Sequence, residues 1–166
     1  GGALVVIDHG RWFYPPAAVA MGLDTSRLVV VRPENEEDEH WAWHQSLAAE
    51  GVAAVLGWPR KLSAAAFRRL QLAAQAGGTL GLLVRPAEVR REPSWADVRL
   101  LVEPQPTPPN RRLLSGRTLR VTILRSRGST GGTSVEVTTG RKIERQTPHT
   151  KTMAKVRMRP QSLHYA

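Results

Sequence analysis

The sequence contains no cysteine among its 166 residues. A disulfide framework, a thiolate metal site and a cysteine nucleophile are therefore excluded, and the absence is compatible with a reducing cytoplasm, which is the location we expect. No apolar run reaches 18 residues, so no segment is predicted to span a membrane. The sequence also lacks an initiator methionine and begins with Gly1 and Gly2, so we expect it to be the interior of a longer protein.

Acidic side chains are scarce in the last third of the sequence. Residues 1–110 hold 11 basic and 12 acidic side chains, a net charge of −1, whereas residues 111–166 hold 13 basic and 2 acidic side chains, a net charge of +11. The formal charge of +10 for the whole chain is therefore a property of one end. Because concentrated positive charge attracts phosphates, DNA is a candidate partner of that end, and a solubilising terminus is the alternative.

Short apolar runs alternate with helix-like segments over the first two thirds of the sequence. Asn35 and Ser63 can each cap the start of a helix, and Gly51 and the pair Gly77-Gly78 follow the helix ends. This alternation predicts an α/β fold with a mostly parallel sheet flanked by helices. The strands are expected at residues 3–7, 27–31, 52–56, 79–84 and 97–103, and the helices at 17–21, 36–50 and 64–76.

A change in composition follows residue 103 and divides the chain. Residues 1–103 are expected to form the α/β core, and the proline-rich stretch 104–117 to act as a linker. Residues 118–140 alternate apolar and polar side chains around a glycine-rich turn, which predicts an antiparallel hairpin that extends the sheet. Residues 141–166 are polar and basic, and we expect this tail to stay disordered until it is bound.

Signatures of catalysis are missing from the sequence. A phosphate-binding loop needs a Gly-Lys pair before Ser or Thr, and no Gly-Lys pair occurs anywhere in the chain. The glycine-rich stretch 128–134 lacks lysine and joins two strands, which favours a plain turn. No Gly-x-Ser-x-Gly elbow is present either. We therefore predict no catalytic residue, no cofactor and no bound metal.

Two motifs leave a metal or a general base as an alternative. Asp8 ends the first predicted strand, where it could serve a metal or a proton transfer, or accept backbone hydrogen bonds within its own loop. His40 and His44 stand one helical turn apart and could share a metal with an acidic residue of the same helix. The alternative for the histidines is a solvated helix face. We favour the non-metal interpretation of both motifs because no second ligand is evident.

Arginine and lysine side chains are the candidate contacts to nucleic acid. Arg85, Arg90 and Arg91 follow the fourth predicted strand, where guanidinium groups could bind phosphates or stand in a solvated loop. Seven further cations in the tail would give affinity without base recognition, and we refer to them as the basic segment. These are Arg141, Lys142, Arg145, Lys151, Lys155, Arg157 and Arg159.

The order of the elements resembles the RecA-type recombinase core, and more closely its relatives in the bacterial ImuA/SulA-like group. The RecA likeness rests on residues 1–8, 15–24 and 28–33, and the ImuA likeness on residues 24–33, 54–62 and 68–74. It covers roughly residues 1–140. The resemblance implies a RecA-like core, with a phosphate loop lying before Gly1 if the full protein has one.

The sequence departs from the RecA pattern at positions that the resemblance assigns to ATP hydrolysis. The acidic residue expected two positions after Asp8 is Gly10, and the Walker B carboxylate expected at the end of the third strand falls at Gly57. The polar residue expected after the fourth strand falls at Arg85. The resemblance therefore implies a degenerate nucleotide site, with Asp8, Gly10 and Gly57 as its remnants.

The same resemblance implies a role in the SOS response to DNA damage. ImuA-like proteins are accessory factors of mutagenic translesion synthesis, and RecA and a polymerase are their implied partners. We therefore expect a non-catalytic adaptor. The alternatives are a fragment of a diverged RecA-type ATPase and a SulA-like inhibitor of cell division.

Overall fold

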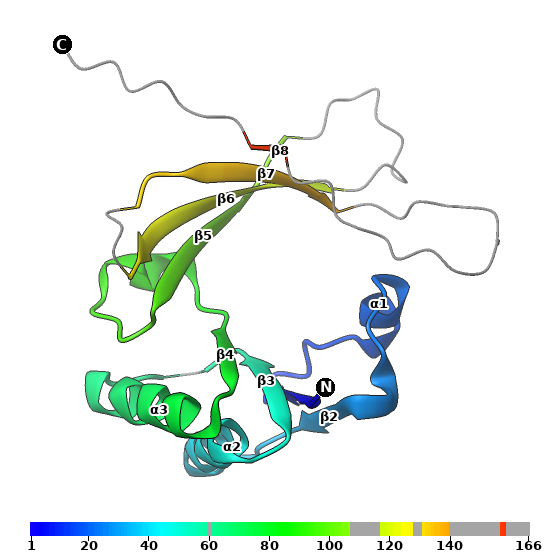
Figure 1. The fold of residues 1–166 in the computed structure, drawn as a ribbon, viewed down its shortest axis with the longest axis vertical. Helices are drawn as coiled ribbons and strands as arrows, with labels where there is room; N and C mark the ends of the chain where they lie inside the picture. Colours follow the sequence, from blue (N-terminus) through cyan, green and yellow to red (C-terminus); the bar gives the residue numbers. More distant parts are fainter. Residues whose placement is uncertain (60, 107–116, 128–130, 140–156, 159–166) are drawn as a thin grey trace. The chain divides into compact units, whose positions relative to one another are not determined.

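The computed structural model describes residues 1–59, 61–106, 117–127, 131–139 and 157–158. It divides into two compact units, Gly1–Trp95 and Ala96–Ala166. Figure 1 shows the ribbon, and each unit is described by itself.

The first unit is built on a parallel four-stranded sheet, as the sequence predicts. Within β1, Val5, Val6 and Ile7 are consecutive and all buried, so both faces of this central strand are covered. The continuous apolar run is typical of such a strand. The strand order is β2-β1-β3-β4, with β1 at Ala3–Ile7, β2 at Leu28–Val31, β3 at Val52–Gly57 and β4 at Leu80–Leu83.

In the described part of the first unit, three helices and one short 3-10 turn connect these strands, and a second 3-10 turn follows β4. The caps predicted from the sequence form: the Asn35 side chain accepts from the Asp38 amide at 2.8 Å, and the Ser63 hydroxyl accepts from the Ala66 amide at 3.1 Å. Gly78 ends the third helix with a φ of +65°, a conformation that favours glycine. The elements are α1 at Pro15–Ala20, η1 at Thr25–Arg27, α2 at Glu36–Ala48, α3 at Ala64–Gly77 and η2 at Ala87–Arg91.

The core of the first unit lies between one face of the sheet and the helices α2 and α3, which lie side by side in Figure 1. Trp43 and Leu47 of α2 are fully buried, and they pack in one cluster with Ile7, Val55 and Leu70. Burying each side chain of this size contributes about 1.5–3 kcal/mol. This packing fixes α2 against the strands whose carboxyl ends form the candidate site.

The second unit holds an antiparallel sheet in the order β5-β6-β7-β8. The predicted hairpin forms between β6 and β7 and places Val121 opposite Val135. Its strands are β5 at Val98–Pro104, β6 at Arg117–Ser126, β7 at Ser134–Thr139 and β8 at Arg157–Met158.

Two expectations about the sheet are wrong. The hairpin was expected to extend the parallel sheet, but β6 and β7 belong to the separate antiparallel sheet. The fifth strand was expected in the parallel sheet, but β5 pairs antiparallel with β6, with Val102 opposite Val121. The physical reason is visible in its composition. Most of β1 to β4 is apolar, whereas β5 includes Arg99 and Glu103, which suits an antiparallel strand with one solvated face. The expectations for residues 107–116 of the linker, and for the tail apart from residues 157–158, lie outside the described residues.

Candidate functional site

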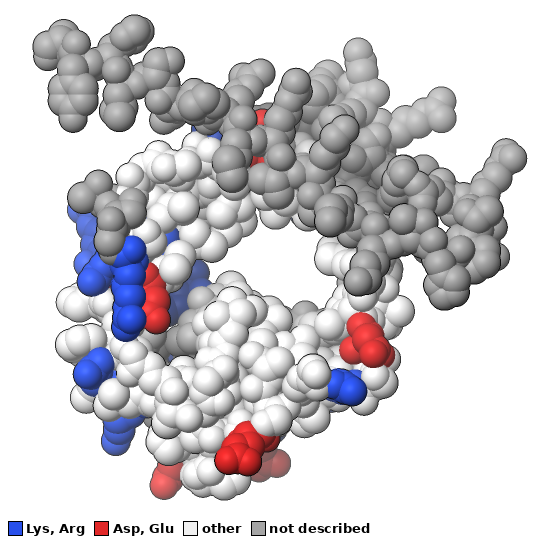
Figure 2. All heavy atoms as spheres, in the orientation of Figure 1, with Lys and Arg blue, Asp and Glu red and all other residues white. Residues whose placement is uncertain are grey.

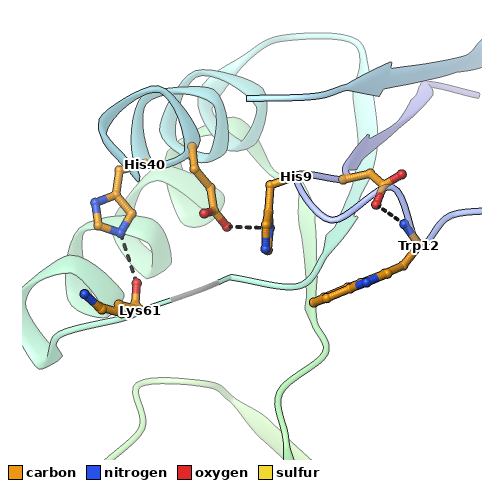
Figure 3. A network of polar contacts seen from close by, with 6 residues as sticks. His9, Trp12, His40 and Lys61 are labelled. Atoms are coloured by element: carbon orange, nitrogen blue, oxygen red, sulfur yellow. Dashed lines mark hydrogen bonds and ion pairs between the residues drawn. The ribbon is translucent and has the colours of Figure 1, made fainter. Parts of the chain in front are cut away.

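The carboxyl ends of the parallel strands are where an α/β sheet ordinarily holds its ligand. In the first unit this edge consists of the loops that follow β1, β3 and β4, together with the start of α2. Asp8, His9 and Trp12 come from the first loop. Figure 3 shows how His9 and Trp12 lie relative to α2 and to Lys61 of the loop after β3.

Asp8 is fully buried, and its carboxylate is used within its own loop. One oxygen accepts from the amide of Trp12 at 2.7 Å, and the other accepts from the amide of Phe13 at 3.2 Å. The guanidinium of Arg32 lies 3.9 Å from the second oxygen. Asp8 thus accepts backbone hydrogen bonds within its own loop, which was one of the two roles predicted for it. These bonds fix the path of the chain after β1.

A second buried carboxylate lies beside this loop. Glu39 of α2 is 1% exposed, and its Oε1 lies 3.7 Å from Nδ1 of His9. This contact was not predicted from the sequence. Helical spacing could have found it, because Glu39 stands three and four residues before the buried Ala42 and Trp43 and so shares their face.

Gly57 ends β3, where the resemblance expects a Walker B carboxylate. A Cβ atom at this position would lie 2.5 Å from the carbonyl oxygen of Ile7 and 2.9 Å from Cζ2 of Trp43. Separations this short do not occur in folded proteins, because they lie well inside van der Waals contact. The Trp43 indole and the Ile7 backbone thus occupy the space that a carboxylate would need.

In the loop after β1, the Trp12 ring lies close to Gly10 and occupies the space that a side chain there would need. A Cβ atom there would lie 2.5 Å from Cε2 of Trp12, whose ring also meets His9 edge-on at a centroid distance of 5.2 Å. The ring of Trp58, which follows β3, meets the Trp12 ring edge-on, with a centroid distance of 6.0 Å and an interplanar angle of 88°. Trp12 is nevertheless 62% exposed, so the two tryptophans form an aromatic surface at this edge. No pattern in the sequence predicts this contact between separate loops.

The histidine pair of α2 does not assemble a metal site. Nε2 of His40 lies 3.0 Å from the backbone oxygen of Lys61, and His44 is exposed. Among the residues that the structure describes, no group of three or more side chains is arranged to hold a metal ion.

The candidate arginines of the first unit differ in their surroundings. Arg85 is largely buried and donates to Glu92 at 2.9 Å, so part of its guanidinium is used within the loop. Arg90 and Arg91 are exposed on η2. The basic segment lies outside the described residues, apart from Arg157. The backbone of Arg157, in β8, pairs with that of Glu136 in β7.

The division into two units sharpens the charge asymmetry. Residues 1–95 contain 10 basic and 10 acidic side chains, a net charge of zero, and residues 96–166 contain 14 basic and 4 acidic side chains, a net charge of +10. The whole formal charge of the chain therefore belongs to the second unit. Much of it comes from the basic segment, which contributes seven cations.

The fold and this edge define an α/β protein in which Trp43 and Trp12 occupy the space beside Gly57 and Gly10 at the carboxyl edge of the parallel sheet. No family model matches the chain. It is 27% identical over 143 residues to the protein ImuA of Caulobacter vibrioides, a match that covers 80% of this chain and 59% of the relative. The chain thus spans less than two thirds of the length of that relative.

The cell-division inhibitor SulA is the second kind of relative. The SulA of Photorhabdus laumondii is 43% identical over 78 residues, which is 47% of this chain and 44% of that protein. The crystal structure of SulA from Pseudomonas aeruginosa is 23% identical, has a TM-score of 0.46, and is matched over 51% of this chain and 71% of that chain. The chain is a weak homologue of ImuA and SulA. Within the described ranges, no helix is long and apolar enough to cross a membrane.

Proposed function

We propose that this protein is a non-catalytic, RecA-like accessory factor of the SOS response, which supports translesion DNA synthesis in the cytoplasm through contacts with RecA and a polymerase partner. The likeness to ImuA over 80% of the chain supports the pathway. The observation that carries the non-catalytic part is the packing at Gly57, where the Trp43 ring and the Ile7 carbonyl leave no room for a carboxylate.

A surface for protein contacts supports the role of an adaptor. Residues 12–23 contain no charged side chain, and α1 within them buries none of its residues. Tyr14 is 67% exposed and Met21 is 80% exposed. Apolar groups gathered on one exposed segment are typical of a protein interaction site.

ATP hydrolysis tests the non-catalytic part of the proposal. The full-length protein is incubated with ATP, with and without single-stranded DNA, and phosphate release is compared with that of an Asp8→Ala variant. We expect no DNA-stimulated turnover in either protein. Robust turnover that is abolished in Asp8→Ala would support the ATPase alternative instead.

Binding to RecA tests the adaptor part. The double variant Tyr14→Ser/Met21→Ser removes two exposed apolar groups and should weaken binding to purified RecA at least tenfold, because well-placed apolar anchors dominate such interfaces. The matched control is Leu72→Ser, which removes an apolar group that is 47% exposed on α3. Equal binding by both variants would show that residues 12–23 are not the contact surface.

A second candidate function is inhibition of cell division, which the 43% identity to SulA favours locally. It is separated from the first by overexpression in a bacterium whose translesion polymerase genes are deleted. A cell-division inhibitor would still cause filamentation there, whereas a translesion accessory factor would leave cell length unchanged and lose its effect on mutation frequency.

A further inference from the structure

One face of α2 carries an exposed tryptophan among carboxylates. Trp41 is 66% exposed, and it stands three and four residues after Asp38 and Glu37, which places all three on neighbouring positions of the helix surface. Glu34, just before the helix, is exposed as well. We call Glu34, Glu37, Asp38 and Trp41 the acidic face.

The acidic face is not neutralised from within its own helix. The sequence of α2 contains no lysine and no arginine. The lysine that reaches this region, Lys61, lies 3.7 Å from Glu36, which is outside the face. Figure 2 shows red surface over the part of the first unit where α2 lies in Figure 1.

A positively charged surface occurs elsewhere on the first unit. Arg69 of α3 and Arg91 of η2 are exposed, and we call them the arginine face. Beside it, the guanidinium of Arg68 on α3 lies 4.7 Å from the ring centroid of Trp95, which stands four residues after the end of η2. Blue surface gathers on the side of α3 and η2 in Figure 2.

The first unit is thus neutral as a whole but polarised, with two different surfaces of opposite sign. A contact between two different surfaces of identical molecules is head-to-tail, and it leaves one free surface of each kind at the ends. A large exposed aromatic side chain at such a contact commonly supplies much of its affinity.

We propose that the acidic face of one molecule binds the arginine face of a second copy of this chain, with Trp41 as the apolar anchor of the contact. The complementary charge of two exposed surfaces on the same neutral unit favours a second copy as the partner. This inference is independent of the proposed function, because it requires neither RecA nor DNA.

The experiment exchanges the charges of the two faces in the full chain. One variant, Glu34→Lys/Glu37→Lys, reverses the acidic face and leaves Asp38, which bonds the cap residue Asn35, unchanged. The other variant, Arg69→Glu/Arg91→Glu, reverses the arginine face. Sedimentation velocity is measured on each variant alone and on an equimolar mixture, at about 50 mM and about 500 mM salt, which screen charges to different extents.

We expect the unmodified chain to associate with rising concentration at low salt and to dissociate at high salt. Each variant alone should be monomeric, because both of its faces then carry the same sign. The mixture should associate again, because each face then meets its opposite. Glu50→Lys, an exposed acidic residue beyond the end of α2, serves as the charge control and should associate like the unmodified chain.

Trp41→Gln tests the anchor and should raise the dissociation constant by roughly thirtyfold, the effect of losing a tryptophan hot spot. Trp12→Gln, which removes an equally exposed tryptophan outside both faces, should change it less than threefold. A monomer at every concentration, association that survives either charge reversal, or a mixture that fails to associate while both variants are folded by circular dichroism would overturn the proposal.

Discussion

The packing at the carboxyl end of β3 gives a quantitative prediction about Gly57. Replacing Gly57 by alanine places a Cβ atom 2.5 Å from the carbonyl oxygen of Ile7 and 2.9 Å from Cζ2 of Trp43. Rotation of a side chain cannot relieve the first contact, because the carbonyl belongs to the backbone of the central strand β1. Overpacking of this kind lowers the free energy of unfolding by about 1–3 kcal/mol.

The carboxylate that a Walker B position requires would be more costly still. Gly57→Asp adds the desolvation of a buried charge, which amounts to several kcal/mol when no partner is provided. Together the two effects approach the whole stability of a small protein, about 5–15 kcal/mol. We expect Gly57→Asp to be unfolded or nearly so, and therefore unable to regain hydrolysis.

Urea unfolding followed by circular dichroism measures the effect, with Gly81→Ala as the matched control. Gly81 lies in β4 of the same sheet, but a Cβ atom there would meet first the end of the Leu47 side chain, at 3.3 Å. That flexible group can move, so Gly81→Ala should change the free energy of unfolding by less than about 1 kcal/mol. Equal stability of Gly57→Ala and Gly81→Ala would refute the steric argument.

Three further predictions concern other parts of the chain. Asp8→Ala should lower the free energy of unfolding by about 2–4 kcal/mol, because the amide groups of Trp12 and Phe13 lose a fully buried, charged acceptor. Urea unfolding would measure this, and a loss below about 0.5 kcal/mol would contradict it. Asp24 accepts hydrogen bonds from the amide and the hydroxyl of Ser26, and these hold the pKa of its carboxyl below the ordinary value. The contribution of this carboxyl to stability is therefore complete above the ordinary aspartate pKa and is lost as the pH falls through the lowered pKa. An NMR titration of Asp24 should give a midpoint below that of an unfolded peptide with the same sequence. Equal midpoints would count against the hydrogen bonds. Replacing all seven cations of the basic segment by glutamine should weaken binding to single-stranded DNA equally for all sequences and flatten its dependence on salt; an unchanged slope would exclude this segment as the contact.

Local patterns in the sequence predicted the first unit well. The helix caps at Asn35 and Ser63 form as expected, because a capping side chain acts on amides only two or three residues away. The four parallel strands appear where the apolar runs lie, since burial on both faces requires such runs. The placement of β5 was wrong because the choice of a partner strand depends on residues far along the chain, such as Val121 opposite Val102.

The candidate site was harder to predict, because it depends on contacts between loops. The sequence placed Asp8 at a strand end and named loop capping as one of its roles, which is a local effect. It could not show that Trp43 fills the space beside Gly57, because 14 positions and a turn of the chain separate the two residues. The contact of Trp12 with Trp58 was invisible for the same reason.

The distribution of charge bears on where a DNA contact should be sought. The described part of the second unit carries ion pairs that neutralise part of its charge, such as Arg127 with Asp97 at 2.8 Å and Arg120 with Glu136 at 3.5 Å. Exposed pairs of this kind contribute little to stability, but they leave fewer cations for phosphate. The basic segment, by contrast, has seven cations and one acidic residue between positions 141 and 159. If DNA binds through this segment, a chain ending at residue 139 should lose the binding and keep the first unit intact, because the core of that unit draws on residues 5–83 alone.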